Sequence, residues 1–81
     1  MSQGFERLGE AVSSARNAKG WTVRDLARQT ALSQATIHGI ERGREPTQLT
    51  QERVAQALGW TPDRISAILQ GGDPTSEDIV S

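Results

Sequence analysis

Residues 22–43, TVRDLARQTALSQATIHGIERG, decide the fold of this chain. The pattern predicts two short helices, one over about 23–30 and one over 34 to about 41. Thr22 and Ser33 stand at the two N-cap positions, where a hydroxyl oxygen can accept a hydrogen bond from the first helical turn. Small and apolar residues that recur at helical spacing, together with one in the turn, form the predicted inward set: Leu26, Ala27, Thr30, Leu32, Ile37 and Ile40.

Apart from the inward Ile37, the first turns of the second helix contain no large apolar side chain. The other residues there are Gln34, Ala35, Thr36, His38 and Gly39. Two short helices joined by a tight turn, the second of which offers small polar groups, are the layout of a helix-turn-helix. In that motif the second helix enters the major groove of DNA. The stretch therefore predicts DNA recognition.

Three further helices are predicted outside this stretch. Apolar positions that recur at three and four residues indicate an amphipathic helix over about 5–19, ended by Gly20. A fourth helix begins between positions 47 and 50 and ends before Gly59. A fifth begins at the Thr-Pro-Asp sequence of 61–63 and ends at the Gly-Gly pair of 71–72. Residues 1–4 are expected to be a loose end, and no strand is indicated. The fold class is all-α.

The size and composition narrow the function. A chain of 81 residues supports one domain with a modest core. Because it has no cysteine and only one histidine, His38, neither a disulfide framework nor a zinc site is expected, and no cofactor is implied. No apolar run approaches membrane-spanning length, and no signal peptide is recognisable. We expect a cytoplasmic protein with no membrane partner.

Charge divides the chain into two parts. It has nine Lys and Arg against ten Asp and Glu, but Asp73, Glu77 and Asp78 lie in the last nine residues. Residues 1–72 therefore hold nine basic against seven acidic residues and are weakly basic. We predict a DNA-binding domain over 1–72 and an acidic, flexible tail over 73–81. Because phosphate neutralisation drives non-specific DNA affinity, that affinity should be modest.

A series of short motifs follows the order and spacing of one family. They are Leu8-Gly9, Arg16, Gly20-Trp21-Thr22, Leu26-Ala27, Leu32-Ser33-Gln34, Thr36-Ile37, Ile40-Glu41-Arg42-Gly43, Pro46 and Val54-Ala55-Gln56-Ala57-Leu58-Gly59. Through them, residues 8–69 resemble the Cro and phage-repressor class of helix-turn-helix domains, the xenobiotic-response-element-type bacterial regulators. The resemblance implies a five-helix, lambda-repressor-like fold that usually binds DNA as a dimer and recognises the major groove with its third helix.

The resemblance also implies roles for individual residues. Gln34 stands where the family commonly places a glutamine that contacts a base, and its amide can both donate to and accept from an adenine edge. The other candidates for base contact are Ala35, His38 and Gly39. The candidates for phosphate contact are Thr22, Ser33, Thr36, Arg42, Gly43 and Arg44, with Gly43 acting through its backbone amide.

Two structural pairings are implied as well. The family joins Arg16 to Glu41 by a partly buried, bidentate ion pair. Many relatives form their dimer between the fourth and fifth helices, where this chain has a small apolar group. Its members are Trp60, Ile65, Ile68 and Leu69. The alternative is that these residues only close the core of the single chain.

The chain departs from the family pattern at Val23, Ala31 and Gln51, and Gly39 is unusual inside a helix. Val23 replaces a glutamine that often braces a phosphate contact, and Gly39 costs about 1 kcal/mol in a helix interior. Gly39 is explained either by close approach of DNA or by loss of a recognition side chain. Ala31 replaces a left-handed glycine, at a cost of about 1 kcal/mol. Gln51 replaces an apolar residue, so Leu49 is expected to pack in its stead.

The leading hypothesis is sequence-specific binding of double-stranded DNA by a transcriptional repressor that acts as a homodimer on an operator. A protein-interaction module or an antitoxin-like, partner-binding protein on the same fold is the alternative. In the latter case residues 73–81 would bind the partner. Near-neutral charge, Val23 and Gly39 favour this alternative. The residues that oppose it are Ser33-Gln34, Arg42 and Arg44. No enzyme is indicated, and no small-molecule ligand is expected.

Overall fold

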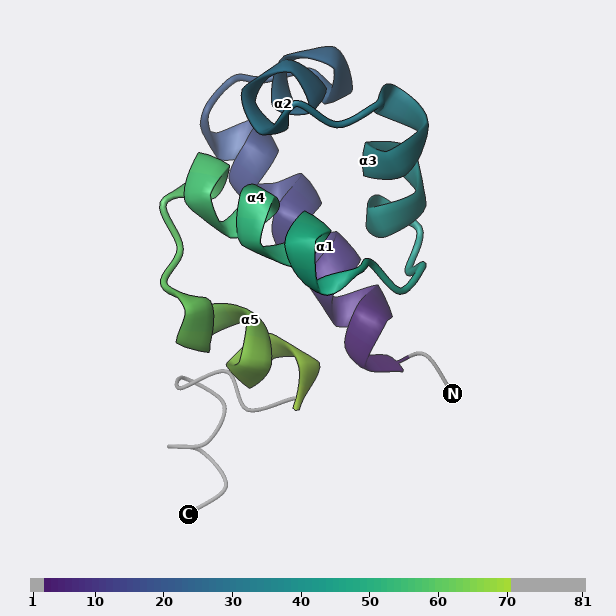
Figure 1. Ribbon diagram of the computed structural model, residues 1–81, viewed down its shortest axis with the longest axis vertical. Helices are drawn as coiled ribbons and strands as arrows, with labels where there is room; N and C mark the ends of the chain where they lie inside the picture. The colour runs from purple at the N-terminus through teal and green to yellow at the C-terminus, as the bar shows by residue number, and fades with distance from the viewer. Residues whose placement is uncertain (1–2, 71–81) are drawn as a thin grey trace.

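The computed structural model describes residues 3–70, which form five helices and no strand (Figure 1). The all-α, five-helix fold predicted from the sequence is confirmed. The helices are α1 (Gln3–Ala18), α2 (Val23–Thr30), α3 (Gln34–Glu41), α4 (Gln48–Leu58) and α5 (Pro62–Leu69).

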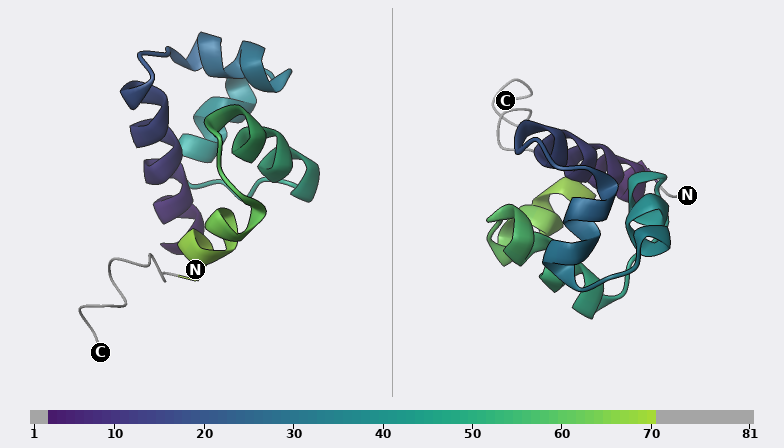
Figure 2. Two further views of the ribbon diagram at one scale, coloured as in Figure 1. Left: turned by 90° about the vertical axis from the view of Figure 1, so that its left-hand side faces the viewer. Right: turned by 90° about the horizontal axis from the view of Figure 1, so that it is seen from above.

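The helix α1 is the support on which the others are arranged. It packs against α3, α4 and α5, while α2 packs against α3 and α4 (Figures 1 and 2). The α2–α3 pair consequently lies at one end of the molecule and α5 at the other. The outer side of α2 and α3 is left without a covering element.

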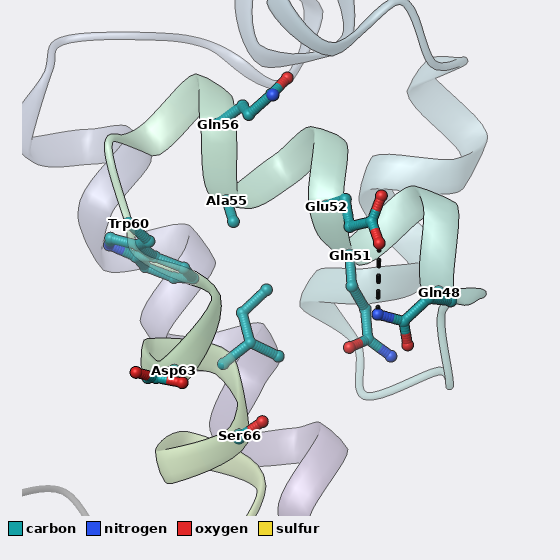
Figure 3. A pocket seen from close by; sticks show the side chains of 9 residues that line it. Gln48, Gln51, Glu52, Ala55, Gln56, Trp60, Asp63 and Ser66 are labelled. Carbon is teal, nitrogen blue, oxygen red and sulfur yellow. Dashed lines mark hydrogen bonds between the residues drawn. The ribbon is translucent and has the colours of Figure 1, made fainter.

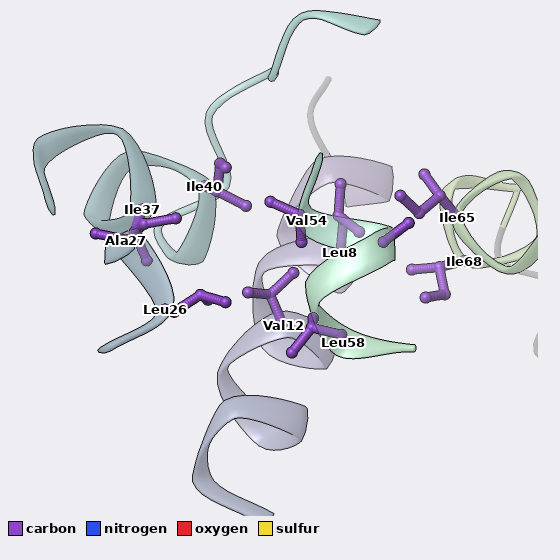
Figure 4. Close-up of a cluster of buried hydrophobic side chains, with 11 residues drawn as sticks. Leu8, Val12, Leu26, Ala27, Ile37, Ile40, Val54, Leu58, Ile65 and Ile68 are labelled. Carbon is purple, nitrogen blue, oxygen red and sulfur yellow. The ribbon is translucent and has the colours of Figure 1, made fainter. Parts of the chain in front are cut away.

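The core lies where these helices meet. Its buried apolar side chains come from all five helices (Figure 4). Trp21 and Trp60 are half-buried and pack against the edge of this cluster. The cluster comprises Leu8, Val12, Leu26, Ala27, Ile37, Ile40, Val54, Ala55, Leu58, Ile65 and Ile68.

Hydroxyl caps set where three of the helices begin. The side chains of Thr22, Ser33 and Thr47 each accept a hydrogen bond from the backbone amide three residues later. At Thr22 the carboxylate of Asp25 also accepts from the cap's own amide, which completes a capping box. Thr61 occupies the N-cap position of α5, but its side chain makes no capping hydrogen bond.

Four helices end in the same backbone motif. The first residue after α2 and α4, and the second after α1 and α3, takes a left-handed conformation. The φ values are 72°, 59°, 98° and 75° at Gly20, Ala31, Gly43 and Gly59. The next residue donates its amide to the carbonyl five residues earlier, which is the hydrogen bond of a Schellman motif. Its N···O distances are 3.1, 3.0, 2.9 and 2.8 Å for Trp21, Leu32, Arg44 and Trp60. The left-handed conformation predicted for Ala31 is confirmed.

The beginning of α1 differs from the prediction. Gln3 and Gly4 belong to the helix, so the expectation of a loose end is wrong for these two residues. A Cβ atom at Gly4 would lie 2.6 Å from the carbonyl oxygen of Leu69, so α1 and α5 touch backbone to backbone there. The predicted end of α5 at positions 71–72 and the tail over 73–81 lie outside the described residues.

The prediction that Leu49 packs in place of Gln51 is wrong. Leu49 is 58% exposed, whereas Gln51 is half-buried. The side-chain amide of Gln51 donates to the carbonyl oxygen of the buried Pro46 at 3.3 Å, so its polar end is satisfied inside the structure. A glutamine can therefore occupy this position without the cost of an unpaired buried amide.

Candidate nucleic-acid interface

The inner face of α3 is fixed by burial. Ile37 is fully buried and Ile40 is 3% exposed, so both side chains anchor the helix in the core. At its beginning, the Ser33 hydroxyl accepts from the Thr36 amide at 3.1 Å. The Thr36 hydroxyl lies 2.9 Å from the same oxygen. These contacts set the rotation and the first turn of α3, and so decide which of its side chains face outward.

The end of α3 is held to α1 by an ion pair. Arg16 Nε donates to Glu41 Oε2 at 2.8 Å and Arg16 Nη2 donates to Oε1 at 3.2 Å, with each side chain 13% exposed. The remaining nitrogen, Nη1, donates to the carbonyl of Trp21 at 2.8 Å. The hydrogen bond to Glu41 raises the pKa of Arg16 above its ordinary value, against the opposing effect of burial. This is the bidentate pair that the family resemblance implied.

A glycine of α1 sets the distance between the two helices. A Cβ atom at Gly9 would lie 2.5 Å from the carbonyl oxygen of Ile40 and 2.8 Å from that of Glu41. Only a residue without a side chain allows this approach of backbone to backbone. The sequence analysis included Gly9 in the resemblance but did not identify this role, because the spacing of apolar residues says nothing about helix crossings.

The outer face of α3 presents polar and small groups. Gln34, Ala35 and His38 are exposed, in agreement with the positions predicted for base contact. Thr36 and Gly39 are half-buried. Thr36 is turned toward Ser33, and Gly39 is covered by the stem of Arg44. The exposed face is thus narrower than the sequence predicted and is centred on three side chains.

The beginning of α2 flanks this face, but its groups are already engaged. The Thr22 hydroxyl accepts from the Asp25 amide at 3.1 Å, and the Thr22 amide donates to Asp25 Oδ2 at 2.9 Å. This backbone donor is the main reason why the pKa of Asp25 lies below its ordinary value. Val23 is half-buried and packs against the core. The residue that replaces the family's glutamine is therefore used for packing.

The segment after α3 supplies two exposed cations, Arg42 and Arg44. The phosphate contact predicted for the Gly43 amide needs correction, because that amide donates to the carbonyl of Ile40 at 3.0 Å. A donor committed to the Schellman motif is not free for a phosphate. Of the three residues after α3 that were predicted to contact phosphate, Arg42 and Arg44 have exposed side chains that another molecule can reach.

Of the hollows on the described part of the chain, two adjoin residues that the sequence predicted for function. One of about 350 Å³ borders the outer face of α3, and its lining includes Ala35, Gly39 and Arg44. The other, of about 500 Å³, lies between α4 and α5 (Figure 3). In the lining of the second hollow, Gln48 Nε2 donates to Glu52 Oε2 at 3.4 Å (Figure 3). Only the first adjoins the face that the sequence singled out.

The residues predicted for a dimer interface are mostly used within the chain. Ile65 and Ile68 are 5% and 8% exposed and belong to the core. Trp60 and Leu69 are half-buried at its edge, and the guanidinium carbon of Arg64 lies 5.7 Å from the centre of the Trp60 ring. The burial of Ile65 and Ile68 is explained by their place in the core of the single chain. A dimer interface formed by these residues with Trp60 and Leu69 stays a prediction.

Residues 3–70 hold no group of three or more His, Cys, Asp or Glu side chains that could bind a metal ion. Within the same range, no helix combines the length and apolar character needed to cross a bilayer.

A short capped helix, a turn through Ala31 and a second helix with an outward polar face define a helix-turn-helix domain. The profile of a family described as "Helix-turn-helix domain" matches residues 7–48, and the chain belongs to this family.

Curated relatives agree with this assignment. Uncharacterized HTH-type transcriptional regulators of Mycobacterium tuberculosis (strain H37Rv) and Mycobacterium bovis are each 34% identical to it over 73 residues. The match covers 89% of this chain but only 28% of each relative, so the chain spans little more than a quarter of their length. No solved structure matches the chain significantly.

Proposed function

We propose that this chain binds double-stranded DNA in a sequence-specific manner and acts in the regulation of transcription, with α3 in the major groove. The observation that carries the proposal is the contrast between the two faces of α3. The inner face is fixed by Ile37, Ile40 and the Glu41 ion pair, whereas the outer face offers Gln34 and His38 to another molecule. A rigid helix with a polar outer face suits recognition of base edges.

The side chains on α3 and at its two ends suit two roles, contact with base edges and contact with phosphates. Gln34, at the first position of α3, can form two hydrogen bonds to an adenine edge, and Ala35 can contact a thymine methyl group. Ser33 and Arg42 stand at the two ends of the helix, where a hydroxyl and a guanidinium would meet phosphates. The relatives named as transcriptional regulators support the same class of function.

We further propose repression by a homodimer as the biological outcome. Occupation of an operator needs only a DNA-binding domain and a partner copy, and paired half-sites follow from two-fold symmetry. Trp60 and Leu69 are half-buried apolar side chains at the edge of the core. The helix α5 lies at the end of the molecule away from α3 (Figure 1). A dimer formed there would leave both copies of α3 free to bind DNA.

The test is fluorescence anisotropy of the protein against a randomised duplex pool across a salt series. Arg42→Ala should weaken binding to all sequences and reduce the salt slope by about 1. Gln34→Ala should relax the preference at one base pair by roughly 1–3 kcal/mol. Arg7→Ala, at an exposed position of α1, is the matched control for loss of a cation and should leave both properties unchanged.

Absence of binding to any duplex at low salt would contradict the proposal. The interaction-module alternative would then have to be tested by a search for a protein partner.

A further inference from the structure

Arg44 directly follows the left-handed residue at the end of α3. At the ends of α1, α2 and α4, the residue in this position has an apolar side chain. In a Schellman motif, the residue after the left-handed one folds back over the last turn of the helix. After α1, α2 and α4 this residue is Trp21, Leu32 or Trp60, and each packs half-buried against the core. After α3 it is Arg44, which is exposed. The same backbone geometry here turns a cation back onto α3.

Gly39 is the residue over which Arg44 lies. A Cβ atom at Gly39 would be 3.2 Å from Cδ of Arg44 and 3.8 Å from its Cβ and Cγ, so the whole stem rests on this position. The Gly39 carbonyl also accepts the Arg44 amide at 2.9 Å. Because Arg44 already covers Gly39, accommodation of this stem explains the mid-helix glycine without a direct approach of DNA.

The side chain of Arg44 is consequently held beside α3. Ala35 lies one turn before Gly39 on the same face, so two small residues stand in line. The hollow of about 350 Å³ is lined by Ala35, Thr36, Gly39 and Arg44, among others. The stem of Arg44 therefore lies against α3, on the side of the helix that carries Ala35 and Gly39.

We propose that Arg44 is a specificity-determining residue that recognises a guanine in the major groove, and that Gly39 is a positioning residue for it. The inference rests on the DNA-binding function proposed above. A guanidinium donates two parallel N–H groups to O6 and N7 of guanine, a pattern that no other base pair offers at that position. An ammonium is a point charge and does not reproduce this fork.

The experiment uses the duplexes selected by the wild-type protein, each with one base pair replaced at a time. Arg44→Ala should abolish the preference for a G·C pair at one position, a loss of roughly 5- to 150-fold. Arg44→Lys should fail to restore that preference. Gly39→Ala should weaken the same preference by displacing the Arg44 stem, and the double variant should lose no more than Arg44→Ala alone.

Three results would overturn the inference. Loss of affinity for all sequences alike, with recovery in Arg44→Lys, would make Arg44 a phosphate contact only. A further loss in the double variant would show that Gly39 itself approaches DNA. Equal binding by Arg44→Ala and the wild type would remove any role. In each case the base preference that depends on Gln34 would persist, whereas failure of the DNA-binding proposal would abolish all duplex binding.

A measurement without DNA tests the contact itself. Alanine is the better helix former, so Gly39→Ala should raise Tm in an Arg44→Ala background, where nothing obstructs the new methyl group. In the presence of Arg44 the increase should be smaller, because the stem must move. Equal increases in the two backgrounds would overturn the packing of Arg44 on Gly39, whatever the DNA affinity.

Discussion

The ends of α2 and α3 share one hydrogen-bond pattern and differ in their side chains. After α2 the left-handed residue is Ala31 and the next is the half-buried Leu32. After α3 the corresponding residues are Gly43 and the exposed Arg44. The backbone motif decides where the following side chain goes, and the nature of that side chain decides whether the helix end closes the core or faces another molecule.

The two ends also differ in how they are braced. At the end of α2, the Thr30 hydroxyl donates to the carbonyl of Leu26 at 2.8 Å, and Arg53 Nη1 donates to the Thr30 carbonyl at 3.3 Å. The Thr30 hydroxyl also lies 3.1 Å from the carbonyl oxygen of Ala27, and none of these hydrogen bonds belongs to an ion pair. At the end of α3, a bidentate ion pair with Arg16 fixes Glu41. We therefore expect the end of α3 to be the more sensitive to substitution.

The largest effect is expected for Glu41→Ala. Removal of this carboxylate leaves the guanidinium of Arg16 largely buried without its partner, and the free energy of unfolding should fall by about 3 kcal/mol. Urea denaturation followed by circular dichroism measures the change. Glu10→Ala, at an exposed position of α1, is the control and should remain within about 0.5 kcal/mol of wild type. Equal midpoints for the two variants would contradict the bracing role.

Truncation to alanine of the side chain that follows each left-handed residue tests the comparison directly. Leu32→Ala removes a half-buried apolar group and should lower the free energy of unfolding by about 1–2 kcal/mol. Arg44→Ala should change it by less than about 0.5 kcal/mol, because Arg44 is itself exposed and does not belong to the core. Parallel urea titrations measure both. A comparable loss of stability for Arg44→Ala would mean that Arg44 is structural.

Substitutions at the two left-handed residues, Ala31 and Gly43, should change the stability of the fold in opposite directions. Ala31→Gly relieves a strained backbone conformation and should be neutral or stabilising by up to about 1 kcal/mol. Gly43→Ala introduces that strain and places a Cβ atom 2.9 Å from Cγ of Glu6. It should therefore destabilise by at least about 1 kcal/mol. Thermal unfolding measures both, and destabilisation by Ala31→Gly would be the contrary result.

The smallest effect is expected at the beginning of α2, where the pKa of Asp25 is lowered chiefly by the amide of Thr22. A carboxyl group whose pKa is lower in the folded state stabilises the fold above its unfolded pKa, near 4, and loses this contribution as the pH falls through the folded value. The Tm difference between wild type and Asp25→Asn should thus be constant near neutral pH. Below about pH 4 it should shrink toward zero. A difference independent of pH would contradict the assignment.

The features that the sequence predicted correctly are local ones. Thr22 and Ser33 cap helices because a hydroxyl at that position finds amides of its own chain, and Ala31 turns left-handed because the helix must end there. These relations span at most a few residues. They were readable without any knowledge of how the helices pack.

The features that escaped prediction depend on contacts between segments. Gly4 and Gly9 lie in a regular helix pattern, and only the crossing with α5 or α3 explains their lack of a side chain. Gly39 remained ambiguous because its explanation, the stem of Arg44, is set by a backbone motif beyond the helix. The Gly43 amide was assigned to phosphate because the sequence could not show that Ile40 already accepts from it.

The guanidinium of Arg16 joins two segments at once, because it donates both to Glu41 and to the carbonyl of Trp21. Opening of the last turn of α3 therefore removes a partner from the turn that precedes α2. The two ends of the helix-turn-helix unit are coupled in one cooperative element, although neither contacts the other directly. Amide hydrogens at both places should exchange with solvent through the same opening event, and the unit should come apart as a whole.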